Sequence, residues 1–115
     1  MSNPSGVPDG ATNFTGLDFH CGANNASVVI TTKLYVDNES GGEAVVNIYT
    51  VLDGTLIDAI PAIYHAGGSR QQHDSDWYGL GQGSHHVDMW LYCASANVSH
   101  VWSRLRADVD KNSTG

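Results

Sequence analysis

Apolar and polar residues alternate along most of this chain, and the alternation decides which folds are open to it. The clearest run spans residues 85–94, where Val87, Met89, Leu91 and Cys93 fall on one face of an extended strand. No segment keeps apolar residues at helical spacing over ten positions. The pattern therefore predicts half-buried β-strands and no long helix.

Turn residues divide the alternating segments into strands of ordinary length. Asp53 and Gly54 form a strong hairpin signal, and Pro61 either ends the strand before it or marks that strand as an edge. With 115 residues the chain has room for a single core. We therefore predict an all-β fold, an immunoglobulin-like antiparallel β-sandwich of about seven strands. The predicted strands are residues 17–21, 27–37, 44–52, 55–60, 70–77, 85–94 and 98–109.

The two ends of the chain differ from its middle in composition. Residues 1–16 are rich in Pro and Gly and poor in apolar side chains, which predicts an extended polar N-terminal arm. Residues 17–110 are the predicted immunoglobulin-like sandwich, and residues 111–115 are a predicted flexible tail. Residues 1–10 also lack the basic and apolar regions of a signal peptide. We therefore expect synthesis in the cytoplasm without export by the usual route.

The charge balance argues against two classes of partner. The net charge is −7, and the chain holds only five Lys and Arg residues. Binding to phosphate backbones or anionic lipids requires a basic footprint, and only Arg104 and Arg106 lie close together in the sequence. No apolar stretch approaches the roughly 18 residues of a membrane-spanning helix. We therefore expect neither nucleic acid nor membrane as a partner.

The two cysteines, Cys21 and Cys93, leave two alternatives open. A disulfide between them would close a loop of about 70 residues and could stabilise the fold by roughly 4 kcal/mol. Their positions near strand ends favour that bridge, whereas the missing signal peptide favours two buried thiols.

Histidine, serine and carboxylate side chains are plentiful, but their spacing predicts no site for chemistry. His85 and His86 are adjacent, so on a strand they point to opposite faces and cannot hold one metal ion together. No serine lies in a G-x-S-x-G turn, and the glycines at 79, 81 and 83 lack the strand-to-helix context of a phosphate loop. We therefore predict no catalytic residues, no metal, no cofactor and no enzymatic activity.

Turn residues also carry a resemblance to a known family. The residues that carry it are 28–38, Ser40-Gly41, Asp53-Gly54, Ala66-Gly-Gly-Ser69, Trp77 and Gly83-x-His85-x-Val87. In these residues the chain resembles the CARDB-type immunoglobulin-like domains of bacterial and archaeal surface proteins, a kind of domain also found in phage decoration and tail proteins. The similarity covers about residues 27–92, and the chain departs from the pattern in a strand-ending turn one residue longer and in its two cysteines. The resemblance implies adhesion or display and supplies no catalytic residues.

The outward sides of the late strands carry the strongest functional signal. If Val87, Met89 and Leu91 fill the core, the side chains between them point outward, and Val101 and Leu105 would likewise point inward from the last strand. In an immunoglobulin-like sandwich those two strands are neighbours, and residues 44–52 lie beside the first of them. The alternative is a different register, with the arm or a loop covering that surface. The predicted binding face, rich in residue types found at interface hot spots, is Tyr49, Trp90, Tyr92, Trp102 and Arg104.

These features predict a structural or binding protein. An external type of fold on a chain without an export signal is typical of virion proteins, which are made in the host cytoplasm. We expect a bacteriophage virion surface component, a capsid decoration or tail protein, that docks on other virion or surface proteins through its arm and aromatic face and forms a homo-oligomer. The alternative is an adhesion or carbohydrate-binding module of a secreted bacterial protein, at the cell surface or outside the cell, with Trp90 and Trp102 as a sugar platform.

Overall fold

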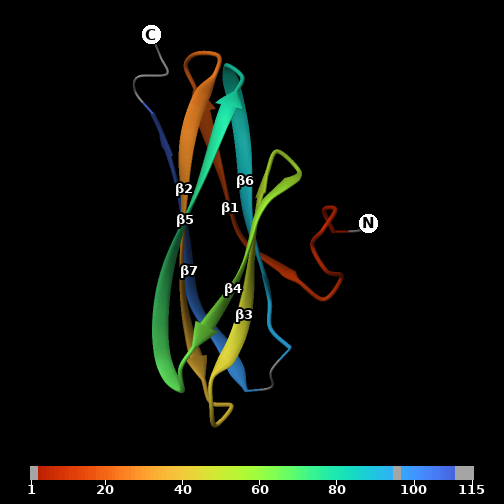
Figure 1. Cartoon of the computed structure of the whole chain (residues 1–115), viewed down its shortest axis with the longest axis vertical. Coiled ribbons are helices and arrows are strands. Elements are labelled where there is room, and N and C mark those ends of the chain that lie inside the picture. The colour runs from red at the N-terminus through yellow and green to blue at the C-terminus, as the bar shows by residue number, and fades with distance from the viewer. Residues whose placement is uncertain (1–2, 95–96, 111–115) are drawn as a thin grey trace.

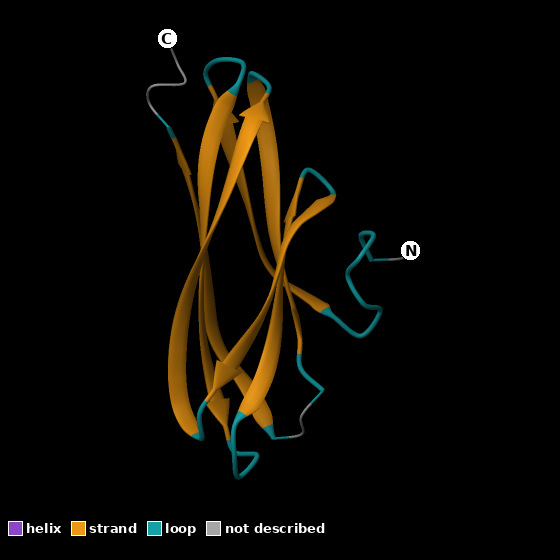
Figure 2. Ribbon diagram, viewed as in Figure 1, coloured by secondary structure: helices purple, strands orange, loops and turns teal. Residues whose placement is uncertain are grey.

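A computed structural model describes residues 3–94 and 97–110 of the chain, and it shows two antiparallel sheets packed face to face (Figure 1; Figure 2). The predicted class, an antiparallel β-sandwich of seven strands, is confirmed. The molecule is long and thin, 52 × 30 × 17 Å, because the strands run along its longest axis. The strands are β1 (Thr12–Cys21), β2 (Ala26–Asn38), β3 (Ala44–Leu52), β4 (Thr55–Tyr64), β5 (Gly67–Leu80), β6 (Gly83–Tyr92) and β7 (Val98–Val109).

The first and last strands have exchanged sheets relative to an immunoglobulin constant domain. Sheet A has the order β1-β6-β3-β4, and sheet B has the order β5-β2-β7. In the immunoglobulin order the first strand lies beside the second and the last beside the sixth. Here β1 pairs with β6 and β7 pairs with β2, all antiparallel. The β1–β2 and β6–β7 connections therefore both cross from one sheet to the other.

Apolar residues at alternate positions fill the space between the sheets, as predicted for β2, β3 and β6. Leu34 and Val36 from sheet B meet Ile48 and Met89 from sheet A in one half of the core. A second cluster fills the other half, around Ile30 and residues from β1, β5 and β6. Leu105, Ala107 and Val109 face this core as predicted.

Four local differences from the sequence prediction have physical causes. β1 begins at Thr12, so part of the predicted arm is strand. β4 continues through Pro61, which is tolerated because β4 is an edge strand of sheet A. β5 extends through Gly79 to Leu80, into the segment predicted as a loop. The prediction that Val101 points inward is wrong, because a β-bulge inserts it between Trp102 and His100, and its side chain is half exposed.

A buried amide at the end of β2 holds the β2–β3 turn and β4 together. The Asn38 side chain is almost fully buried, and its Nδ2 donates to the carbonyl oxygens of Gly42, Tyr64 and His65. Its Oδ1 accepts hydrogen bonds from the backbone N–H and the hydroxyl of Ser40. One side chain thereby satisfies backbone groups from two connections at the same end of the sandwich.

We expect Asn38→Ala to lower the free energy of unfolding by at least about 2 kcal/mol, because truncation leaves buried acceptors unpaired. Urea denaturation at neutral pH measures the change. Asn47→Ala is the matched control, since Asn47 lies half-buried on the outer side of β3, and it should change stability by less than about 0.5 kcal/mol. Equal losses in the two variants would contradict the assigned role of Asn38.

Candidate functional site

The structure divides the predicted binding face between opposite sides of the sandwich. Tyr49, Trp90 and Tyr92 lie on the outer side of sheet A, whereas Trp102 and Arg104 lie on the outer side of sheet B. The prediction of one continuous face is therefore wrong. Its error lies in the assumed neighbourhood of the last two strands, because β6 and β7 belong to different sheets. The outward orientation assigned to each of the five side chains is nevertheless what the structure shows.

The chain's own N-terminal segment, residues 3–11, covers the sheet A half of that face. Val7 and Ala11 are buried against Val51, with Tyr49 and Trp90 packed around them. Figure 1 shows this segment beyond sheet A, on the side away from sheet B. The arm is therefore folded back on its own domain, which is the alternative that the sequence left open.

Two close approaches show how tightly the segment lies on sheet A. A Cβ atom at Gly10 would come within 2.8 Å of the Tyr92 ring, and one at Gly6 would come equally close to Leu56. The indole N–H of Trp90 is buried with no hydrogen-bond partner in the described part of the chain. This surface is closed to a partner as long as the segment stays in place.

The cysteine bridge is ruled out by the strand register. Cys21 pairs with Gly83 at the start of β6, whereas Cys93 follows the end of β6. Ten residues of extended strand separate these two ends by about 30 Å, and a disulfide needs Cα atoms within about 7 Å. Burial, aided by the negative charge of Asp53, raises the pKa of the Cys21 thiol, which favours its protonated form.

The outer face of sheet B carries the basic residues of this acidic chain. Four of the five Lys and Arg residues fall within the described residues, and all four point outward from sheet B. Lys33 on β2 lies directly between its partners Gln72 on β5 and Arg104 on β7. These side chains surround a hollow of about 440 Å³, which we call the cationic hollow; it is lined by Lys33, Arg70, Gln71, Gln72, Trp102 and Arg104.

The Trp102 ring lines one side of the cationic hollow, with Tyr35 beside it. The Arg104 guanidinium carbon lies 5.7 Å from the centre of the Trp102 ring, within the range of a cation–π contact. Tyr35 is the cross-strand partner of Trp102, with ring centres 6.0 Å apart. The Tyr35 hydroxyl lies against Gly68, where a Cβ atom would collide with it. Sequence reasoning identified Trp102 and Arg104 but missed the basic residues beside them, which strand parity on residues 27–37 and 70–77 could have placed there.

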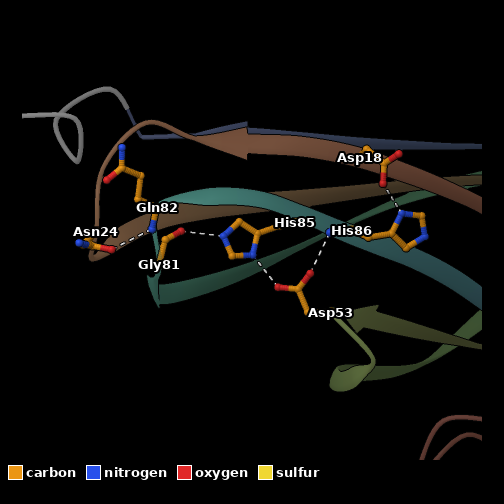
Figure 3. Close-up of polar contacts among 7 residues, drawn as sticks. All are labelled: Asp18, Asn24, Asp53, Gly81, Gln82, His85 and His86. Atoms are coloured by element: carbon orange, nitrogen blue, oxygen red, sulfur yellow. Dashed lines mark hydrogen bonds and ion pairs between the residues drawn. The ribbon is translucent and has the colours of Figure 1, made fainter.

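A histidine–aspartate cluster lies at the start of β6, between β1 and the β3–β4 turn (Figure 3). His85 Nδ1 lies 2.5 Å from Asp53 Oδ2, and its Nε2 lies 2.7 Å from the Gly81 carbonyl oxygen. His86 lies between two carboxylates, with Nδ1 2.6 Å from Asp18 and Nε2 2.8 Å from Asp88. The other Asp53 oxygen accepts the His86 backbone N–H. The cluster joins β1 and β6 to the β3–β4 turn, through Asp53, and to the β5–β6 turn, through Gly81.

The partners of both histidine rings favour the charged form. A hydrogen bond to Asp53, and a second to the Gly81 carbonyl, raise the pKa of His85. Hydrogen bonds to Asp18 and Asp88 raise the pKa of His86. Partial burial alone would raise the pKa of Asp53, but hydrogen bonds from His85 and His86 together with their charges bring that pKa below its ordinary value.

This cluster has the geometry of a structural tie and lacks that of a general base. Each ring nitrogen faces an oxygen, so in the charged form both nitrogens of each ring can donate and no lone pair is left. Among the described residues, no three His, Cys, Asp or Glu side chains converge as ligands for a metal ion. The described part of the chain also contains no helix long and apolar enough to span a membrane.

Comparison with known proteins adds no identification. No protein-family model matches the sequence, and no curated protein matches it either. The resemblance to CARDB-type domains therefore stays a prediction.

The histidine–aspartate cluster predicts a stability maximum in mildly acidic solution. Both histidines have folded-state pKa values above the unfolded value of 6.5, so their contribution is full below pH 6.5 and is lost as the pH rises through the folded values. Asp53 has a folded-state pKa below 3.8, so its contribution is present above pH 3.8 and lost as the pH falls through the folded value.

Urea midpoints measured from pH 4 to 9 should fall on the alkaline side by the equivalent of about 1 kcal/mol, as for partly exposed ion pairs. The double variant His85→Gln, His86→Gln should remove most of that fall. His20→Gln, at an exposed position of β1, is the matched control and should keep it. A fall of the same size in the double variant would contradict this role for the cluster.

Proposed function

We propose that this protein is a non-enzymatic binding protein. An acidic surface of its partner docks on the outer face of sheet B. One observation carries the proposal: an acidic chain with few basic residues gathers all four of its described Lys and Arg side chains on this face. Dispersed surface charges would serve solubility equally well. Three of these four side chains line one hollow, which supports recognition of negative charge.

The residue types of the cationic hollow support a protein partner. Trp, Tyr and Arg are the side chains most often found at interface hot spots, and Trp102, Tyr35 and Arg104 lie together here. The rings offer apolar area at small entropic cost, and Lys33 and Arg70 add charges that can meet carboxylates from several directions. The matching partner is an aspartate- or glutamate-bearing protein surface. An acidic polysaccharide is the other class that such a hollow could hold.

A virion surface component, with docking as its role, remains our proposal for the protein's setting. Nothing in the folded domain requires a reaction, and a thin two-sheet slab with one charged face suits a subunit that attaches laterally to a neighbour. The predicted docking elements are revised accordingly. The arm lies on its own sheet A, so the proposed contact is the face of sheet B.

Binding to surfaces coated with poly-L-glutamate and with polygalacturonate tests the proposal. At low ionic strength we expect the protein to bind polyglutamate, and Trp102→Ala and Arg104→Gln each to weaken binding about tenfold. Arg106→Gln is the matched control for Arg104→Gln, because the Arg106 Nε already lies 2.8 Å from its neighbour Asp108, and it should have a smaller effect.

Three outcomes separate the possibilities. Binding to polyglutamate that depends on Trp102 and Arg104 supports the proposal. Binding to polygalacturonate alone would replace the protein partner by an acidic polysaccharide. Absence of binding to either surface, or binding that ignores both substitutions, would overturn the proposal. Melting curves of each variant exclude unfolding as the cause.

A further inference from the structure

The outer face of sheet B has a second hollow of opposite charge. It lies beyond Thr31 along β2 and has a volume of about 440 Å³, like the cationic hollow. We call it the acidic hollow. Exposed Val29 and Tyr78 give it apolar surface, as Trp102 does for the first hollow. Its lining is Ser27, Val28, Val29, Asp76, Tyr78, Asp108, Val109 and Asp110.

The strand register fixes how the two hollows are related. Lys33 and its partner Arg104 mark the cationic hollow, and Val29 with its partner Asp108 marks the acidic one, four residues further along each strand. That separation is about 13 Å along the sheet. Three basic residues line the first hollow and three aspartates line the second. The face is therefore self-complementary along its length.

We infer that the partner of this face is a second copy of the same chain, stacked antiparallel so that each cationic hollow covers the other copy's acidic hollow. This inference rests on the proposed function and names its partner. A two-fold axis in the plane of the interface, near Thr31, generates the arrangement, and every contact then occurs twice. Trp102 would lie in the interface near the acidic hollow of the partner, where the partner's Tyr78 adds apolar area.

The residues nearest the two-fold axis, which are Thr31 and its cross-strand partners, are compatible with this stacking. Arg106 pairs with Thr31 across the strands and would lie near its own copy in the partner. Its Nε lies 2.8 Å from Asp108 Oδ2, so these two side chains partly offset each other's charge within one copy, and Asp76 adds a further negative charge to the acidic hollow. Asp74, in the same row, accepts a hydrogen bond from the Thr31 hydroxyl at 2.8 Å. The positive charges that face the partner are those of the cationic hollow.

The size of the face predicts a weak and salt-dependent dimer. Three strands and about nine residues of length give a patch of roughly 400 Å² per copy. The total of about 800 Å² lies below the 1,200–2,000 Å² typical of stable complexes. Charge pairs at the rim of such a contact are screened by salt, so the dimer should dissociate as ionic strength rises.

Charge reversal in the full chain tests the inference. The first variant, Lys33→Glu with Arg104→Glu, reverses the cationic hollow, and the second, Asp76→Lys with Asp108→Lys, reverses the acidic one. Sedimentation velocity from about 10 µM to about 1 mM at low salt should show a dimer for the wild type and at least tenfold weaker association for each variant alone. Mixing the two variants should restore association, because each reversed hollow then meets an opposite charge.

The pair of variants controls for net charge, since one lowers it by four and the other raises it by four. Glu39→Lys with Glu43→Lys gives the same increase of four on the β2–β3 connection, outside this face, and should leave the wild-type dimer intact. The single changes Arg104→Glu and Asp76→Lys provide a second pair if a double variant unfolds.

Each remaining outcome counts against the inference. A wild type that stays monomeric at about 1 mM overturns it, as does a dimer that both variants retain, or a mixture of variants that fails to associate. Binding to polyglutamate by a monomeric wild type would overturn the dimer and leave the proposed function standing. A monomer that also fails to bind polyglutamate would remove both.

Discussion

The pairing of the two terminal strands determines every surface of this molecule. Because β1 pairs with β6, the outer side of sheet A receives the chain that precedes β1, and residues 3–11 lie across Trp90 and Tyr49. Because β7 pairs with β2, the basic residues of the last strand join those of β2 and β5 on sheet B. With the immunoglobulin pairing, Trp90 and Trp102 would share a sheet. The exchange separates a covered aromatic face from an open charged one.

The charged side chains divide in a similar way, between groups paired within the fold and groups on the outer face of sheet B. The cluster at the β3–β4 end places two histidines among three carboxylates, so positive and negative groups there satisfy one another within the fold. On sheet B the cationic hollow and the acidic hollow are separated by about 13 Å along the strands. Groups that far apart cannot neutralise each other within one copy, since exposed charges at such distances are screened. The histidine pairs serve the domain itself, whereas we propose that the basic side chains of the cationic hollow serve another molecule.

Strand parity was readable from the sequence because one side of each strand is buried. It gave the inward set of β2, β3 and β6, the exact bounds of β3 and β7, and the outward direction of Trp102 and Arg104. Parity along a strand carries no information about which strand lies beside it. The neighbours of β6 and β7 depend on long-range pairing, so the sequence misplaced the binding face and left the Cys21–Cys93 bridge open. The bulge at Val101 is likewise invisible, because β-branched residues suit both sides of a strand.

Trp90 and Trp102 both point outward from this thin sandwich, but they differ in what lies over them. Both rings point away from the core, and both are only partly exposed. Trp90 is only partly exposed because the apolar side chains of Val7 and Ala11 pack against it. The glycines of the same segment lack side chains, which lets its backbone lie in contact with sheet A. Trp102 has basic and aromatic neighbours and no chain above it among the described residues. Among the described residues, the chain covers Trp90 but not Trp102. Under our proposal the cover of Trp102 is another molecule with negative charge, and a second copy of this chain carries the acidic hollow about 13 Å along the same face.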